Sequence, residues 1–368
     1  MSLNDREDLL IFMKLRPISI LPTFVLLLLL GIGAAAQYLP PPTNPDTGPQ
    51  TNSDEPTSAS PRPQSADEQD QSVKTFKVDV NVVNLLFNVK DKHNGLVPNL
   101  TKDDFQLAED GKPQTIKYFK AESNLPLTLG LLIDTSGSMS NVLPMEKVVG
   151  ADFLERVLRE QDMGFVISFD VNVDLQQDFT NSKRELRAAM DHTRINSGVG
   201  SSGLPGLGGG PVPISNPRGT LLYDAVYLAA NDKLSREVGR KALILMTDGE
   251  DQGSQTPLRA AQEAAQRADT IIYVLLIADR QLSMGTGEGD MRKLSEDTGG
   301  RVIRVNNPNK LRDAFDQIGA ELRSQYSIGY TPTNLKRDGA FRKIEIKSKA
   351  GYKIQARKGY YAPLESGQ

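Results

Sequence analysis

Five oxygen-bearing side chains stand where apolar segments of the chain end. Asp134, Ser136 and Ser138 follow one apolar run, and Asp248 ends a second one. Thr220 precedes a pattern that is typical of a helix. These two carboxylates and three hydroxyls offer only oxygen, the ligand atom that hard cations such as Mg²⁺ prefer. The residue types therefore predict a divalent cation site, provided that the fold brings the segments together.

A sheet of parallel strands would bring these segments together. Strands are expected at 127–133, 164–169, 173–179, 242–246, 271–277 and 302–305. Helices are expected at 146–158 (with Val148, Val149, Phe153 and Val157 on one face), 186–193, 221–234, 257–268, near 291 and at 310–323. Apolar strands between amphipathic helices indicate a mostly parallel α/β sheet, covered on both faces. Such sheets bind ligands at the carboxyl ends of their strands, where Asp134 and Asp248 lie.

The five residues resemble a known motif. Asp134-x-Ser136-x-Ser138, followed by Thr220 and Asp248, is similar to the metal-ion-dependent adhesion site (MIDAS) of von Willebrand factor type A (VWA) domains. The chain more narrowly resembles the bacterial "VWFA-related domain" proteins, which carry a short β-rich stretch before the A domain and a basic tail like that at 358–363. The resemblance covers about residues 75–363 and implies a Rossmann-like VWA domain.

The resemblance also implies roles for the five side chains. Ser136, Ser138 and Thr220 would bind the metal directly, and Asp134 and Asp248 would hold it largely through water. The metal would be Mg²⁺, with Mn²⁺ or Ca²⁺ as alternatives. Neutral hydroxyls leave the cation with much of its charge, so the site could accept an Asp or Glu from a protein partner. Taken singly, each residue could instead cap a helix.

The segments on either side of the middle region have the period-two alternation of β-strands. In the N-terminal flank the expected strands include 83–89, 105–107 and 115–119. In the C-terminal flank they are 326–330, 341–346 and 352–356. Neither flank has enough strands to close a sandwich comfortably. We therefore expect 75–122 and 325–362 to form one small β-sandwich, with the VWA domain, 126–323, inserted between its halves.

The N-terminus has the features of an export signal. Lys14 and Arg16 precede an apolar run that is densest at 24–30, and an Ala-rich exit at 34–36 gives a cleavage pattern. Residues 1–36 are thus expected to be a signal peptide, with an uncleaved membrane anchor as the alternative. Residues 37–72 are rich in proline and polar residues, which predicts a disordered linker. The expected localisation is secreted or periplasmic.

The composition of the chain bears on which classes of function are possible. The chain has no cysteine, which excludes thiol catalysis, and its net charge of −3 gives no argument for nucleic acid. His93 and His192 fit no nucleophile or zinc spacing and are expected on the surface. The basic stretch 336–358 could contact an acidic polymer or lipid, but its charges at 341–349 alternate with Ile344 and Ile346, which favours the solvent face of a strand. Contact with a membrane is expected only through an uncleaved N-terminal segment.

Three function classes stay open. The favoured one is a non-enzymatic, exported module that binds a protein ligand presenting an acidic residue. A metal-dependent hydrolase would need a general base, for which Glu250 and Asp251 are the plausible residues; these two could also form a second cation site, although a solvated acidic loop fits them better. The third class is a structural protein of the cell envelope. A Gly-rich segment, 197–211, is expected at the rim of the site.

Overall fold

The computed structural model describes residues 82–122, 124–195, 219–277 and 287–365. The chain divides after Lys74, and all described residues belong to the second unit, Thr75–Gln368. The expected signal peptide, the linker and the Gly-rich segment at 197–211 lie outside the described residues. Within those residues, no helix is long and apolar enough to cross a membrane.

A six-stranded sheet with the order β10-β9-β8-β5-β6-β7 forms the middle of the chain. Its strands are β5 (Leu127–Asp134), β6 (Met163–Phe169), β7 (Val173–Thr180), β8 (Arg240–Thr247), β9 (Thr270–Ile277) and β10 (Val302–Val305). All neighbouring strands pair in parallel except β7, which is antiparallel to β6. Every residue of β5 and β9 is buried, as expected for strands covered on both faces. The predicted mostly parallel sheet is confirmed.

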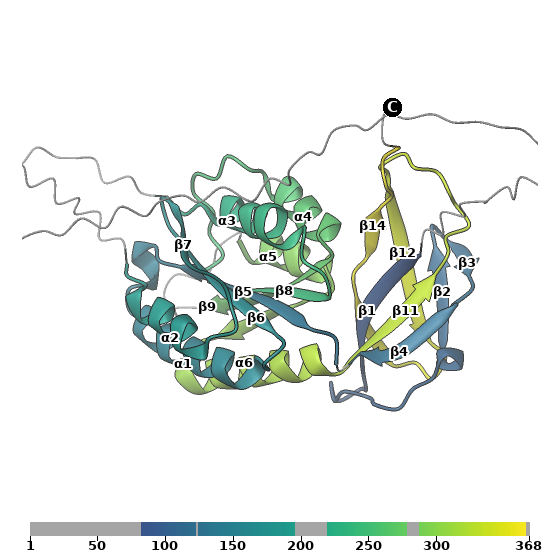
Figure 1. The fold of residues 1–368 in the computed structure, drawn as a ribbon, viewed down its shortest axis with the longest axis horizontal. Helices are drawn as coiled ribbons and strands as arrows, with labels where there is room; N and C mark the ends of the chain where they lie inside the picture. The colour runs from purple at the N-terminus through teal and green to yellow at the C-terminus, as the bar shows by residue number, and fades with distance from the viewer. Residues whose placement is uncertain (1–81, 123, 196–218, 278–286, 366–368) are drawn as a thin grey trace, which may run out of the picture. The chain divides into compact units, whose positions relative to one another are not determined.

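Helices cover both faces of this sheet (Figure 1). One core cluster joins it to α1 (Leu143–Val157), α2 (Lys183–His192) and α6 (Pro308–Arg323). The other joins it to α3 (Leu222–Leu228), α4 (Leu258–Arg267) and α5 (Gly287–Glu296). Residues Ala229–Leu234 continue α3 as a π-helical turn. The helix prediction was wrong in one detail: Val148 is 51% exposed, because it faces away from the stripe of Val149, Phe153 and Val157.

The two flanks of the chain build a separate pair of antiparallel sheets. One has the order β13-β1-β11-β4, formed by Lys353–Ala356, Val83–Lys90, Gln325–Tyr330 and Tyr118–Glu122. The other has the order β14-β12-β2-β3, formed by Gly359–Tyr361, Phe341–Ser348, Phe105–Glu109 and Lys112–Gln114. Both sheets contribute to one aromatic-rich core. The predicted β-sandwich made from both flanks is confirmed.

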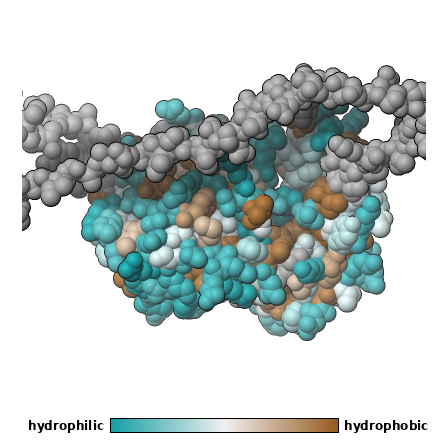
Figure 2. Space-filling view, viewed as in Figure 1, coloured by the Kyte–Doolittle hydropathy of each residue, from teal (hydrophilic) through white to brown (hydrophobic). Residues whose placement is uncertain are grey.

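The strand expected at 115–119 differs from the structure. The chain leaves one sheet after Gln114 and enters the other at Tyr118, so residues 115–117 connect two short strands that lie in different sheets. The strand β14 was not predicted, because residues 359–361 show no alternation of apolar and polar side chains. On the face shown in Figure 2, hydrophobic patches are interspersed among hydrophilic residues.

A buried ionic cluster joins the end of α6 to the sandwich. The carboxylate of Glu321 accepts hydrogen bonds from Lys90 Nζ at 2.8 Å and from Arg301 Nε at 2.9 Å. Its backbone carbonyl accepts a hydrogen bond from Asn88 Nδ2 at 2.7 Å. Because α6 leads directly into β11, this cluster fixes the point at which the inserted α/β region returns to the sandwich.

Candidate metal centre

The carboxyl ends of β5 and β8 form the candidate site. These strands are neighbours in the sheet, with Ile133 opposite Met246, so their ends lie side by side. Asp134 is the last residue of β5, and Asp248 directly follows β8. After Asp134 the chain makes a short 3₁₀ turn, Gly137–Met139, before α1 begins. Strand pairing therefore brings together two segments that are far apart in the sequence.

A continuous chain of hydrogen bonds links four of the five predicted residues. Asp134 Oδ1 accepts from the backbone N–H of Ser136 at 2.9 Å. The hydroxyls of Ser136 and Ser138 lie 3.0 Å apart, and Ser138 Oγ donates to Asp248 Oδ2 at 2.6 Å. Asp134 is buried, Ser136 and Asp248 are half-buried, and Ser138 is exposed. The cluster thus reaches from the interior to the surface.

Thr220 is held beside this cluster by its backbone. Its N–H donates to the carbonyl of Gln252 at 2.9 Å, and its carbonyl accepts from Gln252 N–H at 3.0 Å. Gln252 belongs to the loop that begins with Asp248, so these hydrogen bonds attach Thr220 to that loop. The next residue, Leu221, donates its N–H to the carbonyl of Asp170 at 2.7 Å. These contacts are made by backbone atoms, so they leave the Thr220 hydroxyl out.

Three residues near the site were missed by the sequence analysis. Thr247 Oγ1 donates to Asp134 Oδ2 at 2.7 Å, and Thr135 Oγ1 donates to Asp170 Oδ2 at 2.9 Å. Each of these three lies at the end of a parallel strand or directly after one, the same signal that identified Asp134 and Asp248. A strand-end rule applied to all polar residues would have found them.

The buried side of the site is electrostatically unfavourable for a carboxylate. Burial, with a smaller contribution from the charge of Asp248, raises the pKa of Asp134 to about 7, although the hydrogen bonds from Ser136 and Thr247 act in the opposite direction. A nearby cation would reverse this effect, because it favours the ionised form. The donor set agrees with a hard divalent ion, since it consists of hydroxyl and carboxylate oxygens.

No group of three His, Asp or Glu side chains that could hold a metal is found among the described residues. A cation at this position would therefore need hydroxyl ligands as well, and the predicted ligands Ser136, Ser138 and Thr220 provide them. The residues present fit Mg²⁺, which accepts few protein ligands and keeps several waters.

The fold places the motif at one edge of the sheet. A mostly parallel sheet with one antiparallel edge strand carries the Asp-x-Ser-x-Ser segment at the end of a central strand, and its Asp248 loop at the end of the neighbouring strand. The middle region thus has the α/β fold and the placement of the motif that the resemblance to VWA domains predicted.

No family model matches the chain, and no curated protein matches it. Among solved structures, proximal thread matrix protein 1 of the mussel byssus shares 14% identity and a TM-score of 0.42, over 66% of this chain and 50% of that one. The chain thus spans half the length of that protein. Another form of the mussel protein has zinc in its MIDAS motif, with 16% identity, a TM-score of 0.42 and coverage of 58% and 49%.

Two bacterial structures are also similar. BatB from Bacteroides thetaiotaomicron shares 19% identity and a TM-score of 0.41, over 53% of this chain and 97% of that one. The vWF domain of the pili tip protein Mfa5 from Porphyromonas gingivalis shares 14% identity and a TM-score of 0.40, over 54% and 95%.

The other candidate residues have local structural roles. Asp251 Oδ1 accepts hydrogen bonds from Ser254 Oγ at 2.5 Å and from Tyr223 N–H at 3.2 Å, which orders the loop after β8. Glu250 is exposed and accepts from Gln252 Nε2 at 3.0 Å. His93 and His192 are exposed, as predicted.

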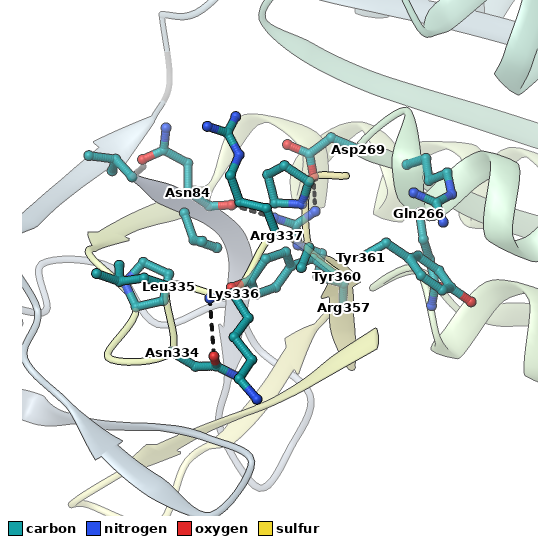
Figure 3. A pocket seen from close by; sticks show the side chains of 16 residues that line it. Asn84, Gln266, Asp269, Asn334, Leu335, Lys336, Arg337, Arg357, Tyr360 and Tyr361 are labelled. Carbon is teal, nitrogen blue, oxygen red and sulfur yellow. Dashed lines mark hydrogen bonds and ion pairs between the residues drawn. The ribbon is translucent and has the colours of Figure 1, made fainter. Parts of the chain in front are cut away.

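A separate cleft of about 450 Å³ lies between the sandwich and the end of α4 (Figure 3). None of the five motif residues lines it. Arg357 crosses it, with Nη1 2.6 Å from Asp269 Oδ1 and Nη2 donating to the carbonyl of Asn84 at 2.6 Å. Arg267 lies 4.4 Å from the ring centroid of Tyr361. These basic groups therefore link the sandwich to the α/β region.

Proposed function

We propose that this protein is a non-enzymatic, exported binding module that holds a divalent cation, Mg²⁺ in the first instance, at Asp134, Ser136, Ser138, Thr220 and Asp248. The hydrogen-bonded chain from buried Asp134 to exposed Ser138 carries this proposal. It supplies oxygens of the right type at the sheet edge where α/β folds bind ligands, and it opens to the surface. We propose Mn²⁺ and Ca²⁺ as alternative ions.

The proposed partner is a protein that presents an Asp or Glu side chain. A bound cation supplies positive charge at the surface, which attracts an acidic group. The hydroxyls of Ser136, Ser138 and Thr220 are neutral, so they do not cancel that charge. Thr247 and the Ser136 N–H hold the Asp134 carboxylate in a fixed orientation at the buried side. Ser138 and Asp248 lie at the accessible side, where the acidic group of the partner would arrive.

A hydrolase is less well supported, because a general base must reach the reacting water. Asp251 is engaged by Ser254 and Tyr223, and Glu250 by Gln252. His93 lies in the loop after β1, and His192 ends α2. The carboxylates that are hydrogen-bonded to the Ser136–Ser138 segment are Asp134 and Asp248, which the proposed site uses to hold the cation.

Titration of the full-length protein with Mg²⁺ and Mn²⁺ by calorimetry tests the cation site. We expect saturable binding by the wild type and none by Asp134→Ala or Thr220→Ala. The matched control is Ser140→Ala, which removes an exposed hydroxyl two residues beyond the motif. Equal binding by the wild type and Asp134→Ala would exclude this site.

The partner claim needs its own experiment. A displayed random peptide library is selected on the wild type with Mg²⁺ and eluted with a chelator. Enrichment of Asp- or Glu-containing peptides that do not bind Asp134→Ala is expected. If Asp134→Ala changes only the stability of the fold, the protein has a structural role. If it abolishes turnover of a substrate, the hydrolase alternative holds.

We propose that the protein is secreted or periplasmic, with 1–36 as signal peptide and 37–72 as linker. The apolar N-terminus and its Ala-rich exit support this. N-terminal sequencing of the exported protein is expected to begin at Gln37. A mature protein that retains Met1 or Met13 in the membrane would instead indicate an uncleaved anchor.

A further inference from the structure

Glu146 is a buried acid that the proposed function does not yet use. It lies in the first turn of α1 and is fully buried, at 0% exposure. Neither of its carboxylate oxygens has a hydrogen-bond partner among the described residues. A buried polar group without a partner is costly and rare, so it points to a group that completes it.

The surroundings of Glu146 lack a compensating positive charge. Burial, with a smaller contribution from the charge of Asp134, raises the pKa of its carboxyl to about 8. The neighbouring Lys147 donates instead to the carbonyls of Asp191 and Thr193, at 2.6 and 3.0 Å. The charge of one buried acid therefore acts on the other, and no positively charged side chain among the described residues offsets it at Glu146.

The chain connects Glu146 to the motif through consecutive hydrogen-bonded turns. Met139 N–H donates to Ser136 carbonyl, Val142 N–H to Met139 carbonyl, and Glu146 N–H to Val142 carbonyl, each at 3.0 Å. Only the turn at residues 140–142 lies between the 3₁₀ turn Gly137–Met139 and α1. Hydrogen-bonded backbone therefore sets the position of Glu146 relative to Ser136.

We propose that Glu146 is a positioning residue of the cation site, and that its carboxylate would balance the charge of the ion and, through water, help to hold the ligands around it. This inference rests on the proposed function. It gives the site a third carboxylate, beside Asp134 and Asp248, and a reason for an acid in an apolar helix face. Outer groups of this kind orient metal ligands, and their loss reduces metal affinity about 10- to 100-fold.

The test compares Glu146→Gln with the wild type in the full-length protein. Gln keeps the shape of the side chain and removes its charge. We expect Mg²⁺ affinity, measured by calorimetry, to fall about tenfold or more. We also expect the metal-free melting temperature to stay the same or rise, and the increase on adding Mg²⁺ to shrink.

The matched control is Glu109→Gln. Glu109 is also buried, at 2% exposure, but it lies in the sandwich and accepts the hydroxyls of Tyr330 and Tyr360, at 2.6 and 3.0 Å. This change is expected to leave Mg²⁺ affinity unaltered. If Glu146→Gln does not fold, Glu146→Met fills the same apolar surroundings without polar atoms and carries the same expectation.

The outcomes are distinguishable. Wild-type affinity and a wild-type temperature shift in a folded Glu146 variant would overturn this inference alone, and would make Glu146 an uncharged structural residue. Absence of cation binding by the wild type would overturn both this inference and the proposed function. An equal loss of affinity in Glu109→Gln would show that the effect is general destabilisation, which would also overturn it.

Discussion

The hydroxyl of Thr247 donates a hydrogen bond to Asp134 Oδ2 at 2.7 Å, across the parallel strands β8 and β5. The same hydroxyl accepts the N–H of Gly249 at 3.0 Å. Asp134 and the loop that contains Asp248 are therefore tied to one side chain. This relationship fixes the Asp134 carboxylate relative to the start of that loop.

We expect Thr247→Val to destabilise the metal-free protein by about 1–3 kcal/mol, because it leaves a buried carboxylate oxygen without its donor. The affinity for Mg²⁺ should fall as well. Urea unfolding and calorimetry measure the two effects. Thr247→Ser keeps the hydroxyl and should restore most of the affinity; if it behaves like Val, the hydrogen bond is not the cause.

Asp170 contacts both of the loops that carry proposed ligands. Its backbone carbonyl accepts the N–H of Leu221, next to Thr220, and its carboxylate accepts the hydroxyl of Thr135 at 2.9 Å. Asp170→Ala removes only the carboxylate and should lower Mg²⁺ affinity about tenfold, since that carboxylate holds Thr135 at the start of the loop that carries Ser136 and Ser138. Asp174→Ala, which removes an exposed carboxylate from β7, is the matched control and should have wild-type affinity.

Gly130 lets β5 pack closely against its neighbours. A Cβ at this position would lie 2.3 Å from Phe165 Cζ and 2.5 Å from Leu243 Cδ2. Gly130→Ala should therefore destabilise the protein by about 1–3 kcal/mol, as overpacking does. Gly137→Ala meets no atom within 4 Å and serves as the control. Equal unfolding midpoints in urea for the two variants would contradict this packing.

Stability should decrease at acid pH through Glu321. Burial alone would raise the pKa of this carboxyl, but Arg301 and Lys90 hold it below the ordinary value. A carboxyl with a depressed folded-state pKa stabilises the fold above its unfolded pKa, and that contribution is lost as the pH falls through the folded pKa.

Urea unfolding of the wild type and Glu321→Gln between pH 6 and pH 2 measures this effect. The variant should be less stable at pH 6, because Arg301 and Lys90 lose their partner in a buried position. The difference between the two proteins should shrink towards pH 2. A constant difference across the range would mean that Glu321 does not titrate as inferred.

Much of the fold follows from local patterns. The buried strands β5, β8 and β9 are nearly continuous apolar runs, which hydrophobicity alone identifies. The β-sandwich was predictable because each flank has too few strands to close by itself. The turn between β3 and β4 was not, since one short alternating segment cannot show that its halves belong to different sheets.

The sequence by itself determined the chemical types at the strand ends, and therefore the candidate ligands Asp134, Ser136, Ser138, Thr220 and Asp248. Only the tertiary structure decided which strands are neighbours, because buried strands have interchangeable apolar patterns. The pairing of β5 with β8 made Thr247 a partner of Asp134. Helix packing likewise turned Val148 outward and buried Glu146, since the face of a helix that meets the sheet depends on contacts distant in the chain.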